Sequence, residues 1–360
     1  MTARPFAARL SCLRSLEFMP ARIAHAIRAF AFAASALVAP LLAFSAPARA
    51  QDWVPFLVQV ACVDARGAPV PGLLPVEPGC TRRRPLGFSD ALPYRKHDWP
   101  AVAIAARRPE GFQASDSLRA TWLGRDVVIQ SMDFGGDGRS FGVFDGTHGD
   151  AAHVIRIAPE DGGAYIIYTG DGRHGGWMRS PGCARGPDGG MQGWLLAAPG
   201  RPGPDGWVER IARLRMAPSI EACPPAFDGS LTRWRIARIA IPWRDTTGGR
   251  GEAMIDTIVT EHYGRAVPIP QSTHLERIWF ARDLGMIRWE RWENRGFSRR
   301  QNLDEAAARL DASQRCPPIA FGDPPPGGGW ARVDCRTWTN FERARPGQPL
   351  HGMPWPEGAR

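Results

Sequence analysis

The sequence predicts an all-β protein, a jelly-roll-like antiparallel β-sandwich with long loops and one short helix near residues 303–311. Short runs rich in β-branched and aromatic residues recur along the chain, and turns rich in Gly and Pro separate them. Many short strands with such turns and little helix are typical of a sandwich or a barrel. No repeat of fixed period is evident, which disfavours a β-propeller.

The elements follow from the local patterns. Gly124-Arg125 joins two strand-like runs in a predicted hairpin, and Asn302 with Glu305 three residues later resembles the start of a helix. The predicted strands are 53–59, 101–106, 118–123, 126–132, 153–158, 164–169, 232–241, 252–263, 275–282, 286–293 and 330–338.

Residues 1–50 have the layout of a cleavable export signal. Arg22 and Arg28 precede an uncharged apolar stretch, and Ala48-Arg49-Ala50 closes it with small residues at the −3 and −1 positions. A transmembrane anchor is the alternative, but the apolar stretch is short and Pro40 interrupts it. We therefore expect a periplasmic or secreted protein with no membrane span after cleavage.

Residues 51–360 then form a single β-sandwich domain, in which 63–95 and 317–329 are irregular segments rich in Pro and Gly. The formal net charge of the whole chain is +9. Six arginines against one glutamate in the leader supply about half of it, so the remaining basic excess is modest and unclustered. We expect no nucleic-acid partner.

Six cysteines follow the leader, and an even number in an exported chain indicates disulfides. Their spacing falls into three local couples, which predicts the pairs Cys62–Cys80, Cys183–Cys223 and Cys316–Cys335. Zinc is the competing interpretation. No C-x-x-C or H-x-x-x-H cluster exists in the sequence, so we expect no metal at these cysteines.

The stretch 274–294 carries the most informative pattern. Strand alternation places Arg288, Glu290 and Trp292 on one face, and a two-residue turn would set Trp279 opposite Glu290 and Arg277 opposite Trp292. In that register Ile278, Phe280, Ile287 and Trp289 pack inward together. The mixed face of Arg, Glu and Trp could bind sugar, since Trp stacks while Arg and Glu hydrogen-bond hydroxyls. A solvated face with ordinary cross-strand pairs is the alternative.

The preceding strand adds candidate acid–base groups. Asp256 and His262 lie on one face of the run 252–263 and Glu261 on the other. If this strand neighbours the hairpin, a second carboxylate, Asp256 or Glu261, would approach Glu290, and two carboxylates can divide the acid and nucleophile or base roles of glycoside hydrolysis. We assign Glu290 as acid or nucleophile and His262 as general base or orienter. Each of these residues could instead make a structural hydrogen bond.

Two Gly-rich loops carry further polar residues. His174 lies in a loop that could close over a ligand. Asp133, Asp137 and Asp145 could hold Ca²⁺, although Asp-Gly pairs are primarily turn formers. We expect no other cofactor.

The general character is similar to secreted jelly-roll domains of the concanavalin type that bind or cleave polysaccharide. The resemblance is one of class, because no family signature is present and the E-x-D-x-x-E strand of one glucanase family is absent. The sequence therefore predicts an exported carbohydrate-active protein, of the glycoside hydrolase or lyase type, with polysaccharide or oligosaccharide as partner. The alternatives are a non-catalytic carbohydrate-binding protein and a structural envelope protein.

Overall fold

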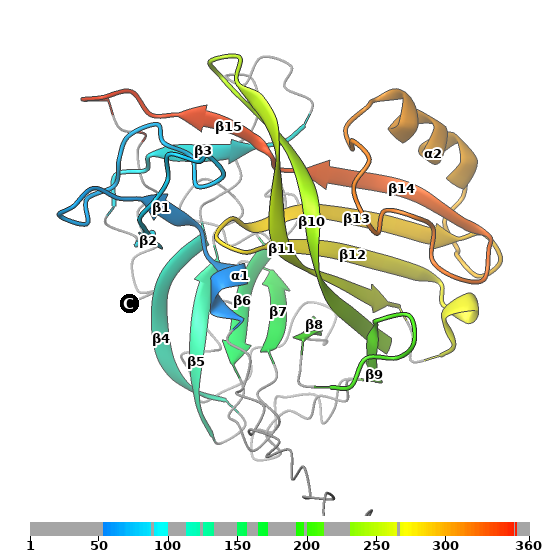
Figure 1. Cartoon of the computed structure of the whole chain (residues 1–360). Coiled ribbons are helices and arrows are strands. Elements are labelled where there is room, and N and C mark those ends of the chain that lie inside the picture. Colours follow the sequence, from blue (N-terminus) through cyan, green and yellow to red (C-terminus); the bar gives the residue numbers. More distant parts are fainter. Residues whose placement is uncertain are drawn as a thin grey trace, which may run out of the picture. The chain divides into compact units, whose positions relative to one another are not determined.

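The chain is all-β, as predicted, in a computed structural model (Figure 1). The structure describes residues 53–87, 90–99, 113–122, 125–132, 150–156, 165–171, 192–197, 200–211, 231–264, 267–348 and 350. The leader, the predicted strand 101–106 and the couple Cys183–Cys223 lie outside these residues.

The largest sheet has eight strands. Its order is β14 (Trp330–Thr337), β13 (Gly285–Asn294), β12 (His274–Ala281), β11 (Arg250–Tyr263), β10 (Leu231–Asp245), β15 (Asn340–Arg343) and β3 (Tyr94–His97), and β9 (Val208–Ile211) also pairs with β10. The pairing of β10 with β15 is parallel and the other pairings are antiparallel, so the sheet is mixed. The long hairpin of β10 and β11 lies beside β12 and β13 in Figure 1.

A second sheet has five strands, each paired antiparallel with the next along the chain. They are β4 (Gln113–Trp122), β5 (Arg125–Met132), β6 (Asp150–Arg156), β7 (Tyr165–Asp171) and β8 (Gln192–Ala197). A two-stranded sheet pairs β1 (Val60–Cys62) with β2 (Arg83–Pro85). Sequential hairpins dominate both larger sheets. The architecture is consistent with a β-sandwich, but this strand order does not confirm the jelly-roll arrangement.

The helices agree only in part with the sequence prediction. The prediction of a strand at 53–59 is wrong, because Val54–Leu57 form the helix α1, with Pro55 in the first turn where a missing N–H costs nothing. The predicted helix near 303–311 is confirmed as α2 (Leu303–Ala312). Asn302 occupies the N-cap position with φ 58° and makes no side-chain cap, while Glu305 pairs with Arg309 instead. A short 3₁₀ helix, η3 (Ile269–Gln271), precedes β12.

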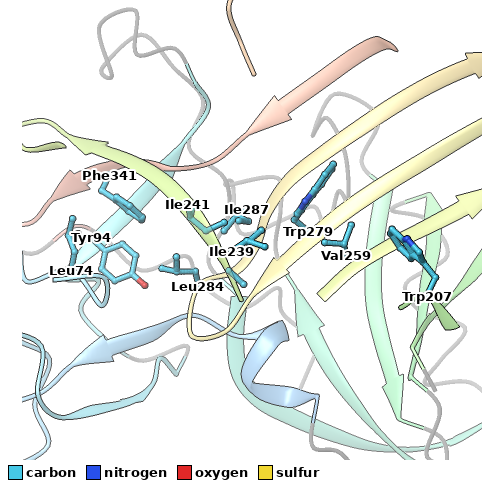
Figure 2. Close-up of a cluster of buried hydrophobic side chains, with 11 residues drawn as sticks. Leu74, Tyr94, Trp207, Ile239, Ile241, Val259, Trp279, Leu284, Ile287 and Phe341 are labelled. Carbon is cyan, nitrogen blue, oxygen red and sulfur yellow. The ribbon is translucent and has the colours of Figure 1, made fainter. Parts of the chain in front are cut away.

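One apolar cluster runs along the eight-stranded sheet (Figure 2). Tyr94 and Phe341 meet edge to face at 5.6 Å at one end, and Trp279, Val259 and Trp207 lie toward the other. Trp279 has no exposed surface. This tryptophan, predicted as a sugar platform, is therefore a core residue in the structure.

Both described disulfides follow the predicted pairing. Cys62 bonds to Cys80 with a Cα–Cα distance of 5.3 Å, and Cys316 bonds to Cys335 at 6.3 Å. The first closes the irregular segment after β1, and the second links the segment after α2 to β14.

No helix in the described part of the chain is long and apolar enough to cross a bilayer.

Replacing both Cys316 and Cys335 by Ser should lower the free energy of unfolding by about 2–4 kcal/mol, because the crosslink restricts the unfolded chain. Urea denaturation of the double variant and of the oxidised parent protein measures this difference. An unchanged midpoint and slope would show that the crosslink contributes nothing to folding.

Candidate functional site

The register of the β12–β13 hairpin corrects the sequence prediction. Trp279 lies opposite Arg288 and Arg277 opposite Glu290, two residues from the expected pairing of Trp279 with Glu290 and of Arg277 with Trp292. Asp283 and Gly285 in the turn have positive φ, and the pairing shifts by one residue at a bulge between Trp279 and Phe280. The observed register differs from the expected one by two residues. Arg277, Trp279, Arg288, Glu290 and Trp292 therefore still share one face of the hairpin.

The predicted face is therefore assembled. Arg277, Trp279, Arg288, Glu290 and Trp292 lie together, and Glu290 accepts hydrogen bonds from Arg288 at 2.6 Å, Trp292 at 2.8 Å and Arg277 at 3.4 Å. The bulge divides the other predicted set. Ile287 joins the cluster around Trp279, while Ile278 pairs with Trp289.

The ion pairs continue across five strands, and we call this row the Arg/Glu ladder. It consists of Arg233 on β10, Glu261 on β11, Arg277 on β12, Glu290 and Arg288 on β13, and Arg332 on β14. Arg233 lies directly opposite Glu261, Glu261 opposite Arg277, and Arg277 opposite Glu290. Opposite charges thus alternate along the row, which is the favourable cross-strand arrangement.

Residues 316–326, which we call the cover segment, close the ladder from solvent. The backbone carbonyl of Pro317 accepts a hydrogen bond from Arg288 at 2.6 Å, and that of Asp323 accepts one from Arg277 at 2.9 Å. Between them, the carbonyl of Ala320 accepts a hydrogen bond from the indole of Trp279 at 3.2 Å. Glu290 has no exposed surface. The polar groups that were expected to face sugar are occupied by the chain itself.

The arginines of the ladder lower the pKa of its two glutamates. Burial opposes ionisation of Glu290, but Arg288, Arg277 and Arg332 outweigh it and hold the pKa of that carboxyl below its usual range. Burial likewise opposes ionisation of Glu261, and Arg277 and Arg233 lower its pKa. An ionised carboxylate without access to solvent has no proton to donate at neutral pH. The contacts of Glu290 are those of a structural counter-ion.

Asp256 and His262 do not join Glu290. They lie on the opposite face of β11, where the hydroxyls of Thr232 and Thr260 approach the two ring nitrogens of His262 at 3.3 and 3.4 Å. Burial lowers the pKa of His262 to about 3, so its ring is a weak base. The catalytic grouping of Glu290, Asp256 and His262 stays a prediction, and this geometry does not favour it.

Glu261 is the carboxylate that the structure brings toward Glu290. The sequence pattern placed it on the face away from Asp256 and His262, which was correct. Its partners Arg233 and Tyr263 were not predicted as site residues. Alternation along 232–241 could have identified Arg233 only if the pairing of β10 with β11 had been known.

An open pocket of about 390 Å³ lies at the turn of the β12–β13 hairpin. The lining comes from four parts of the chain: the irregular segment before β2, the start of β2, the hairpin of β10 and β11, and the turn itself. The lining residues are Pro75, Val76, Arg83, Arg238, Ala253, Met254, Ile255, Asp256, Arg282, Asp283 and Leu284. The side chain of Met254 is 54 % exposed, and that of Asp256 45 %. A ligand can therefore reach this site from solvent.

Three guanidinium groups and two carboxylates line the pocket. Arg83 pairs with Asp283 at 3.0 Å, and Arg282 pairs with Asp256 at 3.5 Å while stacking 4.6 Å above the ring of Phe56. Arg238 lies opposite Asp256 in the register of β10 and β11, and its side chain makes no ion pair or hydrogen bond with another described residue.

Sequence reasoning named Asp256 as a catalytic partner of Glu290, and it predicted neither this pocket nor its three arginines. Arg83 is separated by 200 residues in sequence from Asp283, which follows Arg282 in the hairpin turn. No local pattern connects them.

Among the described residues, no group of three or more His, Cys, Asp or Glu side chains is arranged to hold a metal ion. The predicted Ca²⁺ ligands Asp133, Asp137 and Asp145 lie outside the described residues, as does His174. These assignments stay predictions.

Comparison with known proteins adds no identity: no family model, no curated protein and no solved structure matches this chain.

Changing Glu290→Gln should lower the free energy of unfolding by about 3–5 kcal/mol, because it leaves Arg288 and Arg277 buried with less compensating charge. Glu305→Gln is the matched control, since that glutamate forms an exposed pair with Arg309 and should cost less than about 0.5 kcal/mol. Urea denaturation measures both. Equal midpoints for the two variants would contradict the structural role of the ladder.

Stability should fall as the pH is lowered from about 6.5 toward 4. The folded-state pKa of His262 lies below its unfolded value, so unfolding takes up a proton in this range. One such proton changes the free energy of unfolding by up to about 1.4 kcal/mol per pH unit. Urea denaturation between pH 7 and 4.5 should show a shallower decline in His262→Asn than in the parent protein. Parallel declines would contradict this origin.

Proposed function

We propose that this chain is an exported protein that binds polysaccharide in the open pocket and does not cleave it. The observation that carries the proposal is the gathering of Arg83, Arg238 and Arg282 around an accessible pocket of about 390 Å³. That volume lies within the range of about 300–1,000 Å³ in which small ligands bind.

The composition of the pocket supports recognition of sugar units. Guanidinium N–H groups donate to hydroxyl oxygens, and the two carboxylates accept from hydroxyl groups. Val76, Met254 and Ile255 supply apolar surface on which the apolar face of a sugar ring can rest.

The burial and ion pairing of the carboxylates are the reason to propose that the protein does not cleave its ligand. Glu290 is sealed beneath the cover segment, and the carboxylates of the pocket, Asp256 and Asp283, are each engaged by an arginine. Glycoside hydrolysis needs one carboxyl that donates a proton and a second that acts as base or nucleophile. An ion-paired carboxylate is an acceptor only.

The location outside the cytoplasm that the leader predicts would suit a protein that binds polysaccharide. The two described disulfides are compatible with a periplasmic or extracellular site. The leader predicted at residues 1–50 would carry the protein there.

The protein recovered after export should be retained on at least one immobilised polysaccharide and should release neither reducing ends nor unsaturated products. Ala253→Phe should weaken retention about tenfold or more, because the ring fills space that the ligand needs. Ala312→Phe on the exposed end of α2 is the control. Affinity electrophoresis measures retention, and product assays detect cleavage. Release of products, or equal retention of the two variants, would contradict the proposal.

A further inference from the structure

We infer that the polysaccharide bound in this pocket is acidic and that Arg238 captures one of its carboxylates. The inference rests on the proposed function and names the ligand class for the same site. Three guanidinium groups against two carboxylates leave the lining with an excess of one positive charge. An anionic ligand group would complete that balance.

Arg238 is the group that carries this excess. Arg83 and Arg282 each face an aspartate in an ion pair. Asp256, the residue opposite Arg238 across the two strands, is paired with Arg282. The guanidinium of Arg238 therefore retains its donors, and a planar fork of donors matches the two oxygens of a carboxylate.

The buried arginines of the same sheet make the contrast clear. Arg277 and Arg288 form ion pairs with glutamates and donate hydrogen bonds to carbonyls of the cover segment. The ladder thus supplies counter-ions to these two buried arginines. Arg238 is exposed and needs none for stability, so its position in the pocket is free to serve a ligand.

The surface beside Arg238 suits an extended chain of sugars. Ile236 is two residues away on β10 and Met254 is two residues from Asp256 on β11, so strand alternation places both on the face that carries Arg238 and Asp256. Both are large apolar residues that remain exposed, at 38 % and 54 %. An apolar strip on either side of a charged centre matches a polymer whose rings stack and whose carboxylate pairs with arginine.

Isothermal titration with polygalacturonate, neutral dextran and dextran sulfate tests the inference. We expect binding of polygalacturonate that weakens as NaCl rises from 50 to 500 mM, because salt screens the ion pair. Arg238→Gln should weaken it about tenfold or more, and Arg238→Lys should retain part of the affinity because it keeps the charge. Arg300→Gln, which removes an exposed charge from a loop, should leave binding unchanged.

The outcomes separate the two proposals. Equal binding of dextran and polygalacturonate, or unchanged affinity in Arg238→Gln, would overturn the acidic ligand while polysaccharide binding stands. Binding of dextran sulfate without polygalacturonate would overturn the carboxylate. Failure to bind any glycan in this panel or the wider one would overturn the proposed function itself. Thermal melting of each variant confirms that it is folded.

Discussion

The burial of arginine and glutamate side chains across four neighbouring strands, β10 to β13, is the constraint on which the rest of this structure depends. Removing a guanidinium from water is costly, and the cost is offset only when every donor finds a partner. The ladder meets part of this demand because charges alternate from strand to strand. A slip of one residue in any strand would turn its ladder side chain to the other face, so the ladder also specifies the register.

The cover segment follows from the same constraint. Two glutamates cannot satisfy all the donors of Arg277 and Arg288, and backbone carbonyls of residues 316–326 accept the remaining hydrogen bonds. A segment rich in Pro has few backbone N–H groups of its own to satisfy. The disulfide between Cys316 and Cys335 fixes one end of it to β14. The Pro-rich composition that predicted an irregular segment is thus also suited to a segment that covers a polar face.

Periodicity predicted the strands and the shared face well, because alternation depends only on neighbouring residues. The faces survived an error in register because it amounted to two residues. The exposure of the face could not be predicted. Arg, Glu and Trp on one side of a strand suit an open sugar site and a buried network equally, and the difference lies in a segment some 30 residues further along the chain. The strand predicted at 53–59 failed for a simpler reason: four apolar residues around a proline fit a short helix as well.

Position along the long hairpin of β10 and β11 separates two uses of arginine. Arg233, near the start of β10, lies in the ladder, where its Nε–H donates to Glu261. Arg238, five residues further on, lies on the opposite face by strand alternation and lines the pocket without a side-chain counter-ion among the described residues. An arginine that is buried beside a glutamate thus helps to hold the strands together. An arginine that is exposed keeps guanidinium donors that face solvent. Which arginine is left without an ion pair among the described residues thus depends on its position in the fold, and composition alone does not reveal this.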